Sequence, residues 1–291
     1  MVELIGQNEA KTFVKGRKSL PNCIIIHGPR QSGKKTLARY IAEKVGYDCI
    51  FIDNKVDSIR EMIDLSSSLA EPTLFVTHVS DMSNAAKNSL LKVTEEPPKN
   101  VHICLIAYSE NEVLATLVSR SWVIPILPYS ADEVGYYLEK FVKSSKDILE
   151  LSHLFSNPGQ VQFVVKNYGK EGLHLYLEKV KFFHENIFEA SASNALKIVD
   201  WFKLKDSDTR EEALIPDLFL TLALNWIGWK NRTAPDFDAV WQNNALLIRI
   251  SACLRQVNTK GRSKTFALNK MVKEVQEIGE LDGFDVRYSG E

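Results

Sequence analysis

The feature that most constrains this chain is a glycine-rich loop placed between an apolar run and a helical pattern. Residues 23–27 read CIIIH, which is typical of a buried strand, and the loop GPRQSGKKT occupies residues 28–36. A helical pattern follows and runs to Val45. A strand, a loop and a helix in this order form a P-loop, where backbone N–H groups and the helix N-terminus hold phosphate. The order predicts a parallel α/β domain, and the alternative is a tight turn in some other α/β protein.

The loop departs from the pattern that an ATPase needs. Gly28, Gly33 and Lys34 fit the spacing Gly-x4-Gly-Lys. Lys35 then stands where Ser or Thr should place a hydroxyl on Mg²⁺, and Thr36 follows it. We therefore expect these five residues to form a degenerate nucleotide site.

The strand expected at 73–77 also lacks the carboxylates of a hydrolysing site. Such a site needs one carboxylate for Mg²⁺ and one to activate water. Thr77 and His78 occupy those positions as a degenerate Walker B motif, and Asp81 comes four residues too late. His78 is either a base or, as is more usual after a buried strand, a structural hydrogen-bonding group. The sequence predicts no intrinsic hydrolysis and no required cofactor, although ATP or ADP could be held without turnover.

Composition is that of an ordinary globular protein and excludes several other classes. The 291 residues are enough for two or three domains, and 45% are hydrophobic and 25% charged. The net charge of −1 means that any contact with nucleic acid must be local. Four scattered cysteines favour reduced thiols rather than disulfides or a metal site. Without a cationic leader or a long apolar segment, we expect a cytoplasmic protein.

Up to about Pro128 the chain alternates strands and helices, as a parallel sheet requires. The expected strands are 23–27, 49–52, 73–77, 101–107 and 122–126. The expected helices are 8–15, 35–45, 56–69, 83–95 and 111–118. After Tyr129 only helical patterns remain, so the predicted fold class is α/β followed by all-α. The later helices are expected at 130–143, 145–155, 160–168 and throughout the chain from about 171.

Three further segments resemble those of AAA+ clamp-loader subunits, in that family's order. Residues 88–98, NSLLKVTEEPP, resemble the segment NALLKxLEEPP, and residues 114–121, LATLVSRS, resemble LLxTxxSRC. Residues 4–7, LIGQ, resemble the opening that borders the adenine pocket. The resemblance implies three domains, which are an AAA+ P-loop α/β domain at 1–128, a helical lid at 129–170 and a helical collar for oligomerisation at 171–291.

Within that family the resemblance is closest to the delta-prime subunit of the bacterial-type DNA polymerase III clamp loader, which typically carries a degenerate ATP site. Cellular members usually insert a four-cysteine zinc module, whereas here residues 47–54 run directly on. Ser121 replaces the final cysteine of the serine-arginine motif. Gln160 stands where active subunits have a lid arginine that senses the γ-phosphate. This compact form is consistent with a divergent, phage-encoded member.

The retained motif is Ser119-Arg120, and the resemblance implies that it faces a neighbouring subunit. An arginine donated across an interface neutralises charge on the transferring γ-phosphoryl group, and its planar fork suits that task. The alternative is a surface arginine paired with a nearby carboxylate. The resemblance also implies that the helix at 83–95 faces DNA, with Lys87 and Lys92 as candidate phosphate contacts, against the alternative of a solvated face.

The function implied by the resemblance is that of a non-hydrolysing stator in a sliding-clamp loader. Its implied partners are the other subunits of a pentameric hetero-oligomeric ring, the sliding clamp and primer-template DNA, in the cytoplasm of a bacterium or of a phage host. One alternative is a motor subunit that hydrolyses ATP, which carboxylates in place of Thr77 and His78 would mark. Another is an unrelated P-loop kinase or NTPase, against which the helical second half argues.

Overall fold

The computed structural model describes residues 2–66, 68–80, 82–188, 198, 200–202, 214–259 and 261–281. The chain divides into two compact units. The first holds residues 1–133 and 157–160, and the second holds residues 134–156 and 161–291. Asp81 lies outside the described residues.

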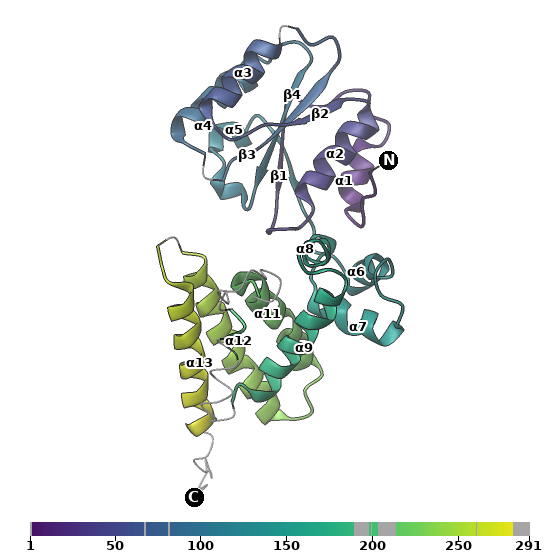
Figure 1. Cartoon of the computed structure of the whole chain (residues 1–291). Helices are drawn as coiled ribbons and strands as arrows, with labels where there is room; N and C mark the ends of the chain where they lie inside the picture. Colours follow the sequence, from purple (N-terminus) through teal and green to yellow (C-terminus); the bar gives the residue numbers. More distant parts are fainter. Residues whose placement is uncertain are drawn as a thin grey trace, which may run out of the picture. The chain divides into compact units, whose positions relative to one another are not determined.

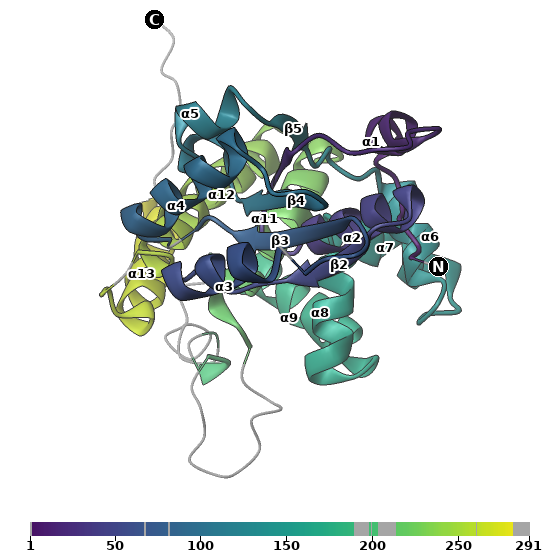
Figure 2. The ribbon, with the colours of Figure 1, turned by 90° about the horizontal axis from the view of Figure 1, so that it is seen from above.

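The first unit is built on a parallel sheet of five strands. These are β1 (Cys23–His27), β2 (Asp48–Phe51), β3 (Thr73–His78), β4 (Val101–Ala107) and β5 (Trp122–Pro125). They lie in the order β2-β3-β4-β1-β5, and Figure 2 shows β2, β3 and β4 side by side. The register is regular, since Ile25 of β1 lies opposite Leu105 of β4 and Val123 of β5. All five expected strands are confirmed.

Helices cover both faces of this sheet, as the nearly continuous apolar strands require. They are α1 (Asn8–Val14), α2 (Lys34–Val45), α3 (Val56–Ser66), α4 (Asn84–Glu95) and α5 (Ala115–Val118). On one face Leu37 of α2 packs in the same core as Ile24 of β1. On the other face Leu90 of α4 packs in the same core as Ile25. Figure 1 shows α1 and α2 on one side of the sheet and α3 and α4 on the other.

Helix α4 begins and ends where the sequence predicts. Ser83 Oγ accepts a hydrogen bond of 3.2 Å from Ala86 N, which satisfies one of the free amides of the first turn. The helix ends at Glu95, directly before Glu96 and two prolines, which cannot continue it. The end of α4 is therefore fixed by the chain itself.

The single helix expected at 111–118 is wrong. The structure has a short 3₁₀ turn, η1 (Glu110–Glu112), then two extended residues, and only then α5. Glu112 is held in this turn because its Oε2 accepts a hydrogen bond of 2.9 Å from Ser80 Oγ. The turn therefore brings a carboxylate close to the end of β3.

The first residues of the chain are tied to the exit of β5 by Gln7. Its Nε2 donates to Leu127 O at 2.8 Å, and Leu127 N donates to its Oε1 at 2.9 Å. Gly6 beside it has a φ of 59°, and a Cβ there would lie 2.6 Å from Glu133 Oε1. The LIGQ segment thus has a structural reason for its glycine and its glutamine.

The described part of the second unit is helical. Its helices are α6 (Ala131–Leu138, which starts in the first unit), α7 (Ser145–Leu154), α8 (Pro158–Tyr168, whose start belongs to the first unit), α9 (Glu171–Asn186), α11 (Pro216–Arg232), α12 (Phe237–Val257) and α13 (Lys264–Leu281). The expected start of α8 at Gln160 is wrong. The helix begins at Pro158, whose missing N–H and fixed φ suit a first turn. The expected order of an α/β part followed by an all-α part is confirmed.

Helix α7 shares a core and polar contacts with α9 and α11. Lys181 Nζ lies 2.7 Å from Glu150 Oε2, and Asn225 Nδ2 donates to Leu154 O at 2.9 Å. The residues expected to form a lid and those expected to form a collar therefore contribute to one compact unit, and the boundary at 170 stays a prediction. Among the described helices, none is long and apolar enough to cross a membrane.

Candidate functional site at the P-loop

The P-loop leaves the sheet at the carboxyl end of β1, which lies between β4 and β5. Gly28 N donates to Ala107 O at 3.2 Å, so the loop starts beside the end of β4. Gly33 ends the loop in a left-handed conformation with a φ of 90° and precedes the first residue of α2. The carboxyl edge of a parallel sheet is where α/β proteins place ligand sites.

Lys34 is directed at carbonyl groups of its own loop. Its Nζ donates to Gly28 O at 2.7 Å and also to Pro29 O. The residue is only 6% exposed. Two of the three N–H donors of the ammonium group are thus used within the loop, and one is left.

Other contacts also hold the loop in its observed conformation. Ser32 is buried, and its Oγ donates to Pro29 O at 2.8 Å. Tyr129 Oη donates to Ser32 O at 3.1 Å. Gly159, at the start of α8, lies against the carbonyl of Gln31 and leaves no room there for a side chain. Each of these contacts lies within the first unit.

The Glu112 carboxylate supplies a negative charge that interacts with the Lys34 ammonium group. Burial lowers the pKa of Lys34 to about 8, the Glu112 carboxylate opposes that change, and Arg30 adds to it. Glu112 is held in place because its Oε2 also accepts a hydrogen bond of 3.0 Å from Tyr108 N. The negative charge beside the P-loop lysine is thus supplied by the protein itself.

The residues expected to hold Mg²⁺ do not converge on the loop. Lys35 is exposed, and its Nζ lies 5.6 Å from the centre of the Phe51 ring. Thr36 follows it on α2 and is half-buried. Thr77 is buried on the same face of β3 as Phe75, and its Oγ1 has no hydrogen-bond partner.

His78 lies on the opposite face of β3 from Thr77, because side chains alternate along a strand. Burial lowers its pKa, and the positive charges of Lys35 and Lys34 lower it further. Both effects favour the neutral form of the imidazole. Its position and charge agree with either a base or a hydrogen-bonding group.

The residues at this site do not fit Mg²⁺-ATP as an active P-loop would. The hydroxyl position holds an exposed lysine, and neither residue at the Walker B position is a carboxylate. The described residues contain no group of three or more His, Cys, Asp or Glu that could hold a metal ion. We derive no catalytic step through nucleotide bound here.

Arg120 lies just after α5 and is accessible to a neighbour. Its Nη1 donates to Thr116 O at 2.8 Å, and its Nη2 lies 3.2 Å from Glu95 Oε1. The Arg120 and Glu95 side chains are 43% and 51% exposed. Ser119 Oγ donates to the same Thr116 carbonyl at 3.1 Å. Within this chain Arg120 is thus a surface arginine paired with a carboxylate, with part of its guanidinium open to solvent.

The two lysines expected to contact DNA differ in their surroundings. Lys87 is half-buried, and its Nζ donates to Glu112 O at 3.1 Å. Lys92 is exposed on the following turns of α4. Of the two, Lys92 has the side chain that is available to a phosphate.

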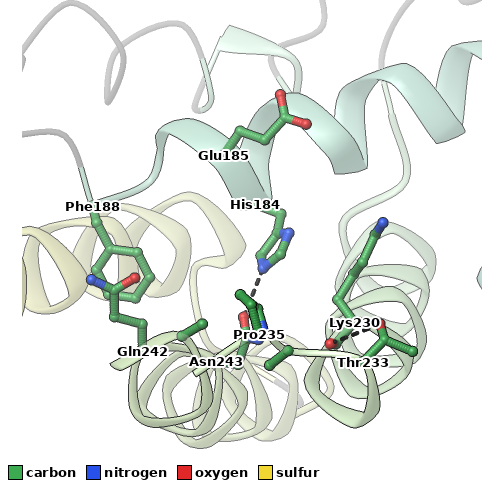
Figure 3. Close-up of a pocket in the computed structure, with 10 residues that line it drawn as sticks. His184, Glu185, Phe188, Lys230, Thr233, Pro235, Gln242 and Asn243 are labelled. Atoms are coloured by element: carbon green, nitrogen blue, oxygen red, sulfur yellow. Dashed lines mark hydrogen bonds between the residues drawn. The ribbon is translucent and has the colours of Figure 1, made fainter. Parts of the chain in front are cut away.

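The second unit contains a separate pocket of about 630 Å³ among α9, α11 and α12. Figure 3 shows His184 pointing toward Asn243, and their Nε2 and Oδ1 atoms are 2.7 Å apart. Lys230, also in the lining, lies over the rings of Trp226 and Trp229 at 4.9 and 4.7 Å. These polar groups are already engaged by the protein, and the lining does not suggest a reaction.

Sequence reasoning missed Glu112 and Glu95. Glu112 follows β4, the strand next to β1, so a carboxylate there could have been suspected once the strand order was known. Glu95 lies within residues 88–98, but nothing in the sequence indicates its contact with Arg120. The position of Glu112 depends on the turn η1, which the sequence did not predict.

Comparison with known proteins supports a relationship to DNA replication proteins. Residues 48–130 match the family described as "DNA polymerase III, delta subunit". The DNA polymerase III subunit delta' of Buchnera aphidicola is 29% identical over 129 residues, which cover 44% of this chain and 37% of that protein. Replication factor C subunit 3 of Saccharomyces cerevisiae is 30% identical over 137 residues, which cover 40% of each chain. The matches thus span well under half of the length of these relatives.

The fold is similar to that of a solved structure along almost the whole chain. A DNA polymerase III, gamma subunit-related protein from Thermotoga maritima aligns with a TM-score of 0.53 and 17% identity. The alignment covers 94% of this chain and 99% of that one. At this identity the likeness concerns the fold alone, and it agrees with the expected α/β part followed by an all-α part.

Proposed function

We propose that this chain, a clamp-loader-like AAA+ protein related to the delta-prime subunit of DNA polymerase III and to replication factor C, is a loader subunit that does not hydrolyse ATP. The observation that carries this proposal is the loss of the groups that hold Mg²⁺ and activate water, since Lys35 stands at the hydroxyl position and Thr77 and His78 stand at the carboxylate positions. The Lys34 ammonium group donates to two loop carbonyls and keeps a third donor, so its direction alone does not decide whether a phosphate binds.

The losses around Lys34 support the same proposal. Hydrolysis needs a metal ligand after the P-loop lysine and carboxylates after the neighbouring strand. Lys35, Thr77 and His78 supply neither. The chain would need no cofactor of its own, and any ATP or ADP bound at this loop would remain unhydrolysed.

The contribution to catalysis would come from Arg120, acting on nucleotide held by a neighbouring subunit. Its guanidinium is partly exposed and carries a permanent charge. Placed near a transferring γ-phosphoryl group, such a group stabilises the charge that develops there. Ser119 would shape the turn that presents Arg120, through its bond to Thr116 O.

The partners in this proposal are the other subunits of a loader ring, a sliding clamp and primer-template DNA. The described helices of the second unit would take part in assembly. On α4, Lys92 would contact a DNA phosphate, and Lys87 would do so only after leaving Glu112 O. The protein would work in the cytoplasm of a bacterium or of a phage host.

The purified chain tests the first part of the proposal. We expect no ATP turnover above background in the presence of Mg²⁺, because the site lacks its metal ligands. The control is Lys34→Ala, which should leave that background unchanged. Turnover of roughly one per second, an ordinary enzymatic rate, that is lost in Lys34→Ala would show a motor subunit instead.

The reconstituted complex tests the second part. Arg120→Ala should leave the complex assembled while lowering its DNA- and clamp-stimulated ATPase rate. Arginines donated in this way accelerate related reactions by about 10³–10⁵, but the bulk loss should be smaller because a single interface would carry this arginine. Arg120→Lys should rescue poorly, since an ammonium group lacks the planar fork. Equal rates for the wild-type and Arg120→Ala complexes, with assembly shown by mass, would leave Arg120 an ordinary surface residue.

A further inference from the structure

The guanidinium of Arg120 is held from two directions by two different helices. Thr116 O of α5 accepts from Nη1 at 2.8 Å, and Glu95 Oε1 of α4 lies 3.2 Å from Nη2. These two contacts use two of the five N–H donors of an arginine. The remaining donors stay free for a phosphate.

The backbone of each anchoring residue is placed by a helix. Glu95 is the last residue of α4, which two prolines end shortly afterwards. Thr116 lies in α5, where Leu117 is fully buried in the core beside α4. Contacts on both sides of its head group restrict the rotamers of a long side chain. The conformational entropy is then already lost before the reaction, and ordering the side chain adds no further cost at that moment.

We propose that Glu95 is a positioning residue for Arg120, which holds the guanidinium in the orientation that it needs across a subunit interface. This inference rests on the proposed function. Exposed ion pairs contribute little to stability, so the pair would orient the arginine without withholding it from a neighbour. Glu95 itself would touch neither the nucleotide nor the reacting atoms.

The test is Glu95→Ala in the reconstituted complex, measured as DNA- and clamp-stimulated ATPase. We expect kcat to fall about two- to fivefold, the range that corresponds to the loss of one exposed charged contact, with KM unchanged. Glu95→Gln keeps an oxygen that can accept from Nη2 and should restore most of the rate. The matched control is Glu96→Ala, which changes the adjacent exposed residue and should have no effect.

A double variant decides whether Glu95 acts through Arg120. In the Arg120→Ala background, Glu95→Ala should cause no further loss, because the group that it positions is gone. An equal loss in both backgrounds would overturn the inference, as would a faster rate for Glu95→Ala alone. The isolated Glu95→Ala chain should melt like wild type, which excludes misfolding as the cause.

The two proposals fail in different ways. If Arg120→Ala lowers the ATPase rate and Glu95→Ala does not, the positioning role is wrong and the proposed function stands. If Arg120→Ala itself has no effect, the proposed function is wrong, and the positioning role is wrong with it.

Discussion

At the scale of single residues, burial in the loop changes the pH at which Lys34 loses its charge. We predict that Lys34 loses its proton at a pH near 8, below its ordinary value of 10.5, because burial disfavours the charged form. Between these values the unfolded chain holds a proton that the folded chain has lost, so stability should rise with pH there. Lysine Cε chemical shifts in a ¹³C-labelled chain measure this pKa, with the signal assigned by its absence in Lys34→Arg.

Glu112→Gln is the matched variant, because it keeps the shape of the side chain and removes the charge. The Glu112 carboxylate favours the charged lysine, so this change should lower the pKa of Lys34 further. Arg30→Ala should act in the opposite direction. The Lys34 signal could instead titrate at the same pH as the surface lysines, with the same pKa in both variants. That result would contradict the buried position of Lys34.

Some residue roles could be predicted from the sequence and others could not. Lys35, Thr77 and His78 could be recognised because a missing hydroxyl or carboxylate is visible in the sequence itself. The contacts of the Lys34 side chain could not, since the P-loop spacing does not say which loop groups the ammonium meets. Glu112 and Glu95 are distant in sequence from Lys34 and Arg120, and only the folded chain brings each pair together.

At the scale of helices and strands, the sequence predicts best where burial and chain-stopping residues agree. The strand at 23–27 is fully apolar before its last residue, and Ser83 and the prolines after Glu96 mark both ends of α4. The error at 111–118 has a clear cause. Apolar spacing there fits one helix, but the hydrogen bond from Ser80 to Glu112 fixes a separate turn instead. A contact between distant segments has thus overridden a local pattern.

At the scale of the whole molecule, the second unit exposes large apolar side chains on α12, and the proposed assembly role predicts that a partner covers them. Phe237, Trp241 and Ile248 of α12 are 78%, 42% and 65% exposed. Their spacing places them on one stripe of the helix, opposite the face that is buried. Deleting everything after Lys170 would be a poor test of assembly, because it would also remove α9 and α11 from their contacts with α7.

Substitution on the exposed stripe is the sharper test of the assembly role. Trp241→Lys combined with Ile248→Lys should leave the isolated chain folded, since exposed positions usually shift stability by about 0.5 kcal/mol or less. The same chain should no longer co-purify with co-expressed loader subunits, because a charged stripe cannot be buried against a partner without a large desolvation cost. The mass of the purified complex measures this directly. Leu65→Lys, which alters an exposed leucine on α3 of the first unit, is the matched control and should assemble normally. A full complex with the doubly substituted α12 would mean that this stripe is not part of an interface between subunits.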